Sequence, residues 1–183
     1  GTEEYYDCDT LLLSCGLIPE NELSSQIGVE LNPVTSGPVV NESLETNVDG
    51  VFACGNVLHV HDLVDYVSGE AKTAGENAAA YVQGNLPEAG KEIPLKGENG
   101  VRYTVPCSVD VDRMTDKQVV RFVWEMFIET SISACIIMIS VSAGLRKSMA
   151  PGEMEQVILL KSKLKEFEGL ESITIRIEEE EQR

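Results

Sequence analysis

Residues 46–84 constrain the fold of this chain more than any other stretch. They contain a short apolar run, residues 51–54, between two glycines, and a run of this kind is typical of a buried strand. A polar turn follows, and apolar side chains then recur at helical spacing up to a stop at Gly84. The predicted helix face consists of Leu63, Val67, Ala71, Ala74, Ala78 and Val82. A strand, a glycine turn and a helix in this order direct the helix N-terminus at an anionic or electron-rich ligand.

The stretch TNVDGVFACGN, residues 46–56, resembles the second FAD-binding motif of the pyridine nucleotide-disulfide oxidoreductases, the family of thioredoxin reductase and NADH oxidase. In that family the strand ends in Gly-Asp, and the Asp holds the ribityl chain of FAD. Asn56 stands in its place here and can bond a hydroxyl without charge assistance. The helix that follows resembles the family helix whose N-terminal amides face the flavin pyrimidine ring. The resemblance implies a cofactor-binding set of Gly55, Asn56, Asp62, Leu63 and Val64.

A second match lies upstream, in the stretch DTLLLSCGLIPEN at residues 9–21. It resembles the strand, glycine turn and proline that carry the family chain from the NAD domain back to the FAD domain. The resemblance covers about residues 5–84 and implies an FAD-dependent oxidoreductase with NAD(P)H as co-substrate. Within the family, the sequence is most similar to bacterial flavoproteins that accompany glycerol-3-phosphate-dehydrogenase-type enzymes.

The chain has no GxGxxG fingerprint, whereas a flavoprotein reductase of this family needs one for FAD and one for NAD(P)H. We therefore expect the sequence to be the C-terminal piece of a longer enzyme, truncated and inactive on its own. The catalytic residues are unknown from this chain. Its half-domain would leave strand edges unpaired, which predicts self-association, and the electron acceptor and any partner subunit are not identified.

From Val101 onward the apolar period changes to two, after a linker expected at residues 87–98. The alternating sets begin at Val101, Val120, Ile137 and Ile173, with a further strand expected near residues 153–160. A short helix over residues 160–167 is an alternative within this part. We predict an α/β plus all-β fold. Residues 1–86 would be the C-terminal portion of a Rossmann-like, three-layer FAD-binding domain, and residues 99–183 a small antiparallel β-sandwich for docking or dimerisation.

Charge and composition exclude several classes of function. The chain has 14 basic and 31 acidic residues and a formal net charge of −17, so it repels nucleic acid and anionic lipid. The first residues do not show the basic and apolar pattern of a signal sequence, and the longest apolar run, residues 134–141, is too short to span a membrane. Five cysteines without a CxxC motif predict reduced thiols in the cytoplasm. Cys15 and Cys54 end two expected strands, where buried packing is favoured over a redox disulfide.

His59, His61 and Asp62 form a compact polar group before the helix. Three roles are open for them: metal ligands, a helix cap supplied by Asp62 or His61, or imidazoles that border the flavin. The chain has no third histidine, so we predict a cap and no metal site. A rival to the whole enzyme hypothesis is a non-enzymatic interaction module in which the acidic β part is the functional one.

Overall fold

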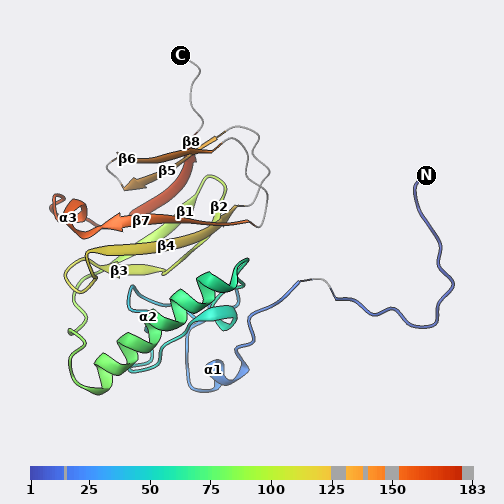
Figure 1. Ribbon diagram of the computed structural model, residues 1–183, viewed down its shortest axis with the longest axis horizontal. Coiled ribbons are helices and arrows are strands. Elements are labelled where there is room, and N and C mark those ends of the chain that lie inside the picture. The colour runs from blue at the N-terminus through green and yellow to red at the C-terminus, as the bar shows by residue number, and fades with distance from the viewer. Residues whose placement is uncertain (15, 125–130, 138–139, 147–152, 179–183) are drawn as a thin grey trace, which may run out of the picture.

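The computed structural model describes residues 1–14, 16–124, 131–137, 140–146 and 153–178. In these ranges the chain forms a helical and irregular part followed by a β-rich part (Figure 1). The elements are α1 (Glu22–Gln26), η1 (Gly55–Val57), α2 (Val64–Val82), β1 (Glu92–Glu98), β2 (Val101–Val105), β3 (Ser108–Asp110), β4 (Lys117–Trp124), β5 (Ser131–Ile137), β6 (Ser140–Arg146), β7 (Met154–Leu160), α3 (Lys161–Leu164) and β8 (Ile173–Glu178). None of the helices in the described ranges is long and apolar enough to cross a membrane.

The described strands form two small sheets that share one core. The five-stranded sheet has the order β3-β1-β8-β5-β6, and the three-stranded sheet has the order β2-β4-β7. Buried side chains from both sheets and from α3 pack together because alternate residues of each strand face the same side. This core consists of Ile93, Leu95, Val101, Val109, Met114, Val120, Phe122, Trp124, Val157, Leu159, Leu164, Ile173 and Ile175. The predicted period of two is confirmed for the strands that contain Val101, Val120 and Ile173, and the alternative of a short helix after residue 160 is confirmed as α3. The set predicted to begin at Ile137 does not form one strand, because β5 ends at Ile137 and β6 begins at Ser140, and residues 138–139 lie outside the described residues.

Two details of the β part differ from the sequence expectation. β1 and β8 pair in parallel, so the larger sheet is mixed and the purely antiparallel expectation is wrong. Residues 92–98 were expected in the linker but form β1. Pro94 and Gly97 made this stretch resemble a turn, whereas Ile93 and Leu95 on either side of Pro94 are buried in the core.

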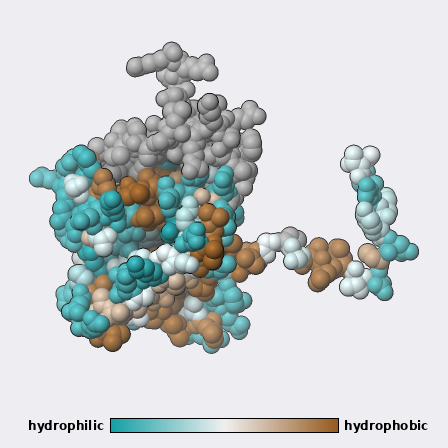
Figure 2. All heavy atoms as spheres, in the orientation of Figure 1, coloured by the Kyte–Doolittle hydropathy of each residue, from teal (hydrophilic) through white to brown (hydrophobic). Residues whose placement is uncertain are grey.

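The first part of the chain lacks the two strands that the sequence predicts. Residues 51–54 form only an isolated bridge between Phe52 and Glu45, and Phe52 is partly buried against its neighbours. Residues 5–14 form no strand over their described positions, and Leu12 is 90% exposed. Figure 2 shows apolar side chains along this extended segment, away from the body of the molecule. An apolar run forms a strand only where a neighbouring segment offers it a series of hydrogen bonds. In the described part of the chain, residues 51–54 make only two such bonds to the neighbouring segment, in which the amide of Thr46 donates to Val51 and the amide of Ala53 donates to Leu44.

Helix α2 is confirmed, but its buried face is not the predicted one. Ala74 is buried as expected, whereas Leu63 and Val82 are 54% and 84% exposed. The other fully buried side chain of the helix is Glu70, which is 2% exposed. Helix α2 therefore packs through a charged residue as well as through small ones.

Several contacts join the first part of the chain to the β part. The amide of Cys107 donates to the carbonyl of Val40 at 2.8 Å. The Arg113 guanidinium lies 2.6 Å from a carboxylate oxygen of Glu45 and 3.4 Å from one of Glu42. Its side chain is only 4% exposed, so these ion pairs are largely shielded from solvent. The predicted domain boundary near residue 86 therefore separates two parts of the chain that are joined by a hydrogen bond and by ion pairs.

The shared core predicts a strong effect of truncation at Ile173. This side chain is 0% exposed, so Ile173→Ala removes three carbon atoms from a closely packed site. We expect the free energy of unfolding to fall by about 2–5 kcal/mol. Ile158→Ala is the matched control, because Ile158 is 52% exposed, and its effect should stay within about 0.5 kcal/mol. Urea unfolding followed by fluorescence of the single tryptophan measures both, and equal losses would contradict the assigned core.

Candidate functional site

The glycine turn before α2 has a left-handed backbone. Gly55 begins η1 with a φ of 71°, a conformation that costs little for glycine and is unfavourable for residues with a Cβ. Its amide is buried and donates to the Oε1 atom of Glu70 at 2.6 Å. The first residue of the turn is therefore hydrogen-bonded to a side chain of α2.

Asn56 lies in the loop that leads from the glycine turn to α2. The amide of His61 donates to the Oδ1 atom of Asn56 at 3.2 Å, which folds residues 56–61 into a closed loop. Leu63 is the N-cap of α2 and supplies no side-chain cap to the described helix. The first amides of α2 therefore remain available to water or a ligand. Leu63 and Val64 expose apolar side chains beside these amides, with 54% and 74% of their surfaces accessible.

Asp62 has a different role from the one predicted. Neither Asp62 nor His61 caps α2, so that expectation is wrong. The Oδ2 atom of Asp62 instead accepts a hydrogen bond of 2.6 Å from the amide of Met154, the first residue of β7. Asp62 thus links the loop before α2 to the three-stranded sheet.

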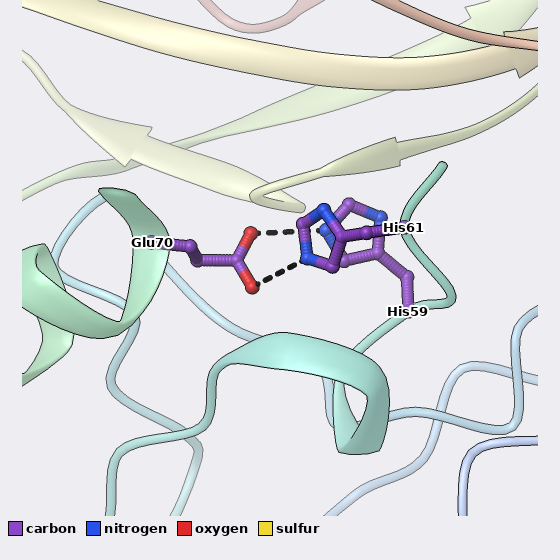
Figure 3. Close-up of side chains that lie close together, drawn as sticks. All are labelled: His59, His61 and Glu70. Carbon is purple, nitrogen blue, oxygen red and sulfur yellow. Dashed lines mark hydrogen bonds and ion pairs between the residues drawn. The ribbon is translucent and has the colours of Figure 1, made fainter. Parts of the chain in front are cut away.

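The two histidines point into the molecule and converge on one carboxylate. The Nε2 atom of His59 lies 3.0 Å from Oε2 of Glu70, and the Nε2 atom of His61 lies 3.0 Å from Oε1 (Figure 3). Both imidazoles are 0% exposed and the Glu70 side chain is 1% exposed. An ionised carboxylate only accepts hydrogen bonds, so both Nε2 atoms carry the protons. The side chains lie beneath the turn, on its buried side.

Strand β4 adds a guanidinium to this group. The Nη1 atom of Arg121 lies 3.3 Å from Oε2 of Glu70, and its guanidinium carbon lies 5.3 Å from the centre of the Tyr66 ring. The ring of Tyr103 in β2 meets His59 edge-on at 6.1 Å. Burial, with a smaller effect of the Asp62 carboxylate, raises the pKa of Tyr103 to about 12, so its hydroxyl stays neutral.

The charges of the cluster follow from these contacts. Burial alone would raise the pKa of Glu70, but hydrogen bonds from His59 and His61 outweigh it and lower the pKa below its ordinary value. Glu70 is therefore ionised. Burial lowers the pKa of His59, although its bond to Glu70 opposes the shift in part. At neutral pH the cluster thus holds a carboxylate and an uncharged imidazole of His59 beside the Arg121 cation.

The same three side chains could in principle bind a metal ion. One ligand atom from each of His59, His61 and Glu70 lies within 4.8 Å of the others, which is a spacing that a divalent ion could span. The carboxylate already receives the Gly55 amide, two imidazoles and Arg121. A guanidinium at 3.3 Å from a ligand oxygen repels a second cation. The arrangement favours an internally neutralised carboxylate over a metal centre.

Glu70 is not among the predicted site residues, although its position in the sequence indicates that it is buried. Glu70 follows Val67 by three residues and precedes Ala74 by four, so it falls on the helix face that packs inward. A carboxylate at such a position requires donors, and the two histidines just before the helix are the nearest ones in sequence. Cys54 lies beside the cluster as a free, half-buried thiol whose pKa is raised by burial and by Glu70. Its suggested partner Cys15 is outside the described residues.

A hollow of about 620 Å³ lies between α2 and the β part, next to the cluster. Its lining includes three carboxylates, Glu42, Glu70 and Glu76, and three cations, Arg113, Lys117 and Arg121. These formal charges cancel, so the hollow attracts neither anions nor cations as a class.

A glycine turn, an uncapped helix start and exposed apolar side chains beside it define a candidate site of the kind used by proteins that bind nucleotide cofactors. Residues 1–84 match the family model described as pyridine nucleotide-disulphide oxidoreductase, which supports the resemblance of this part of the chain to that family. The family implies a Rossmann-like FAD-binding domain. Residues 85–183 lie outside the match.

Curated relatives from archaea agree with this assignment. The chain is 29% identical over 120 residues to a CoA-dependent NAD(P)H sulfur oxidoreductase of Pyrococcus furiosus, which covers 63% of this chain and 26% of that protein. It is 30% identical over 110 residues to an NAD(P)H coenzyme A polysulfide/persulfide reductase of Pyrococcus horikoshii, covering 59% and 24%. The chain thus spans about a quarter of these relatives. No solved structure matches it significantly.

The lowered pKa of His59 predicts a loss of stability on acidification. Unfolded histidine binds a proton near pH 6.5, whereas folded His59 stays neutral to lower pH. The unfolded state therefore takes up more protons, and the free energy of unfolding falls as pH drops from 7.5 to 5.5. Glu70 adds a further loss below about pH 4.5, when the unfolded carboxyl becomes protonated first.

Urea unfolding at several pH values measures this effect, with His59→Gln as the comparison. The variant should lose less stability than the wild type between pH 7.5 and 5.5. Equal losses in the two proteins would contradict a neutral, buried His59.

Proposed function

We propose that this chain contributes the ribityl and pyrimidine side of the flavin site to an FAD-dependent NAD(P)H oxidoreductase. The observation that carries the proposal is the Gly55 turn, which precedes α2 within the family match and is bonded to Glu70 of that helix. Gly55, Asn56, Asp62, Leu63 and Val64 form the proposed cofactor-binding set. FAD would supply the hydride chemistry, and the protein would bind it and tune its reactivity.

The chemistry of the turn supports this assignment. The Asn56 side chain is exposed and can bond a ribityl hydroxyl, whereas the family aspartate would do so with a charge. The amides of Leu63 and Val64 lie at the positive end of α2, which stabilises negative charge on a reduced flavin. The exposed Leu63 and Val64 side chains offer apolar surface to the ring.

The proposed co-substrate follows from the relatives of the chain. The names of both Pyrococcus relatives include NAD(P)H, so we propose NADH or NADPH as the hydride donor or acceptor. Because the chain spans a quarter of those relatives, the activity of the complete enzyme is part of the proposal, and its electron acceptor is unassigned. We expect the chain alone to be inactive. A cytoplasmic location remains a prediction.

The β part is proposed to serve docking or dimerisation. Residues 99–183, together with β1 at residues 92–98, would form a sandwich-like domain, and residues 1–86 would be the flavin part. Exposed apolar residues of the N-terminal segment, such as Leu12, support self-association. The alternative, a non-enzymatic interaction module, would place the function in the β part alone and require no flavin.

Substitutions at Asn56 test the proposed contact. Loss of one neutral hydrogen bond in Asn56→Ala should raise the FAD dissociation constant by about 3- to 10-fold. Asn56→Asp should bind FAD at least as tightly as the wild type, because a carboxylate bonds the hydroxyl more strongly. Asn85→Ala, at an exposed site beyond the other end of α2, is the control and should leave the constant unchanged. Isothermal titration of the complete flavoprotein measures it, and unchanged binding in Asn56→Ala would remove the best residue of the proposed site.

A further inference from the structure

Glu70 joins the proposed flavin turn to the β part of the chain. One of its carboxylate oxygens accepts from the Gly55 amide at 2.6 Å and from His61 at 3.0 Å. The other accepts from His59 at 3.0 Å and from Arg121 of β4 at 3.3 Å. Four donors from the turn, the loop and the sheet thus meet at one buried side chain.

We propose that Glu70 is a positioning residue for the flavin site, and that through Arg121 it makes the β part a structural component of that site. The inference rests on the proposed function. Glu70 would not touch the cofactor, because its carboxylate lies beneath the turn with 1% of the side chain exposed. It would instead fix where Gly55 holds the backbone of Asn56, the residue proposed to contact the ribityl chain.

The geometry makes the link stiff. Hydrogen bonds to an ionised acceptor are shorter and stronger than neutral ones, and the 2.6 Å bond from Gly55 falls in that class. An ionised group with 1% exposure cannot exchange these donors for water, so moving the turn leaves the charge unsatisfied. Asp62 supplies a second connection, since it accepts from the amide of Met154 in β7 at 2.6 Å. The turn and the loop behind it are therefore held by two different strands of the same sheet.

The test uses Glu70→Gln with Glu76→Gln as its matched control. Both residues belong to α2, but Glu76 is 68% exposed and only approaches Lys72 at 3.9 Å. The amide proton of Gly55 should resonate far downfield in the wild type and move upfield in Glu70→Gln, while Glu76→Gln leaves it in place. In the complete flavoprotein, Glu70→Gln should weaken FAD binding about tenfold or more, and Glu76→Gln should have no effect.

The outcomes separate this inference from the proposed function. Wild-type affinity for FAD in Glu70→Gln would overturn the positioning role and leave the flavin site intact. If the wild-type flavoprotein binds no FAD, the proposed function fails, and with it the role of Glu70 at that site; a shifted Gly55 resonance would then report only a structural contact. If Glu70→Gln does not fold, Arg121→Met replaces it, and an unchanged FAD affinity in that variant would refute the contribution of the β part.

Discussion

A buried carboxylate is the constraint on which the rest of this structure depends. Removing an ionised group from water is costly, so Glu70 can lie inside the protein only if donors surround it. The chain supplies them from three places: the Gly55 turn, the two histidines of the following loop and Arg121 of β4. Each donor fixes the segment that carries it. The position of α2, the shape of the turn and the contact with the sheet therefore follow from the same requirement.

Different interactions stabilise the two parts of the chain. In the β part, strands with alternating apolar residues bury one shared core, which includes Val120 and Ile173. In the first part, few residues outside α2 are in regular structure, and polar side chains form hydrogen bonds that hold the irregular segments in place. The buried Asn21, for example, donates to the carbonyls of Ser36 and Val57 at 2.9 and 2.7 Å. Side-chain hydrogen bonds of this kind can hold a binding loop in one conformation. Backbone groups of the loop that are not paired in a sheet can then bond a ligand.

The sequence predicts the elements whose periodicity is local and misses those that need a distant partner. The existence of helix α2 and of strands such as β4 is predicted well, because helical and alternating spacing are local properties of the sequence, but the buried face of α2 is not predicted. Residues 51–54 have the composition of a buried strand but find only a single bridge to Glu45. For the site, Gly55 and Asn56 follow from the motif. Glu70 does not, because three of its partners lie 9 to 51 residues away in the chain.

The backbone amide spectrum of the complete flavoprotein, recorded while FAD is added to the FAD-free protein, tests the central claim most directly. It reports each amide separately and detects weak as well as tight binding. We expect the resonances of Gly55, Asn56, Leu63 and Val64 to shift together and to saturate with one dissociation constant. If FAD leaves these four amides unchanged, or shifts only residues elsewhere in the chain, the turn before α2 is not part of a flavin site.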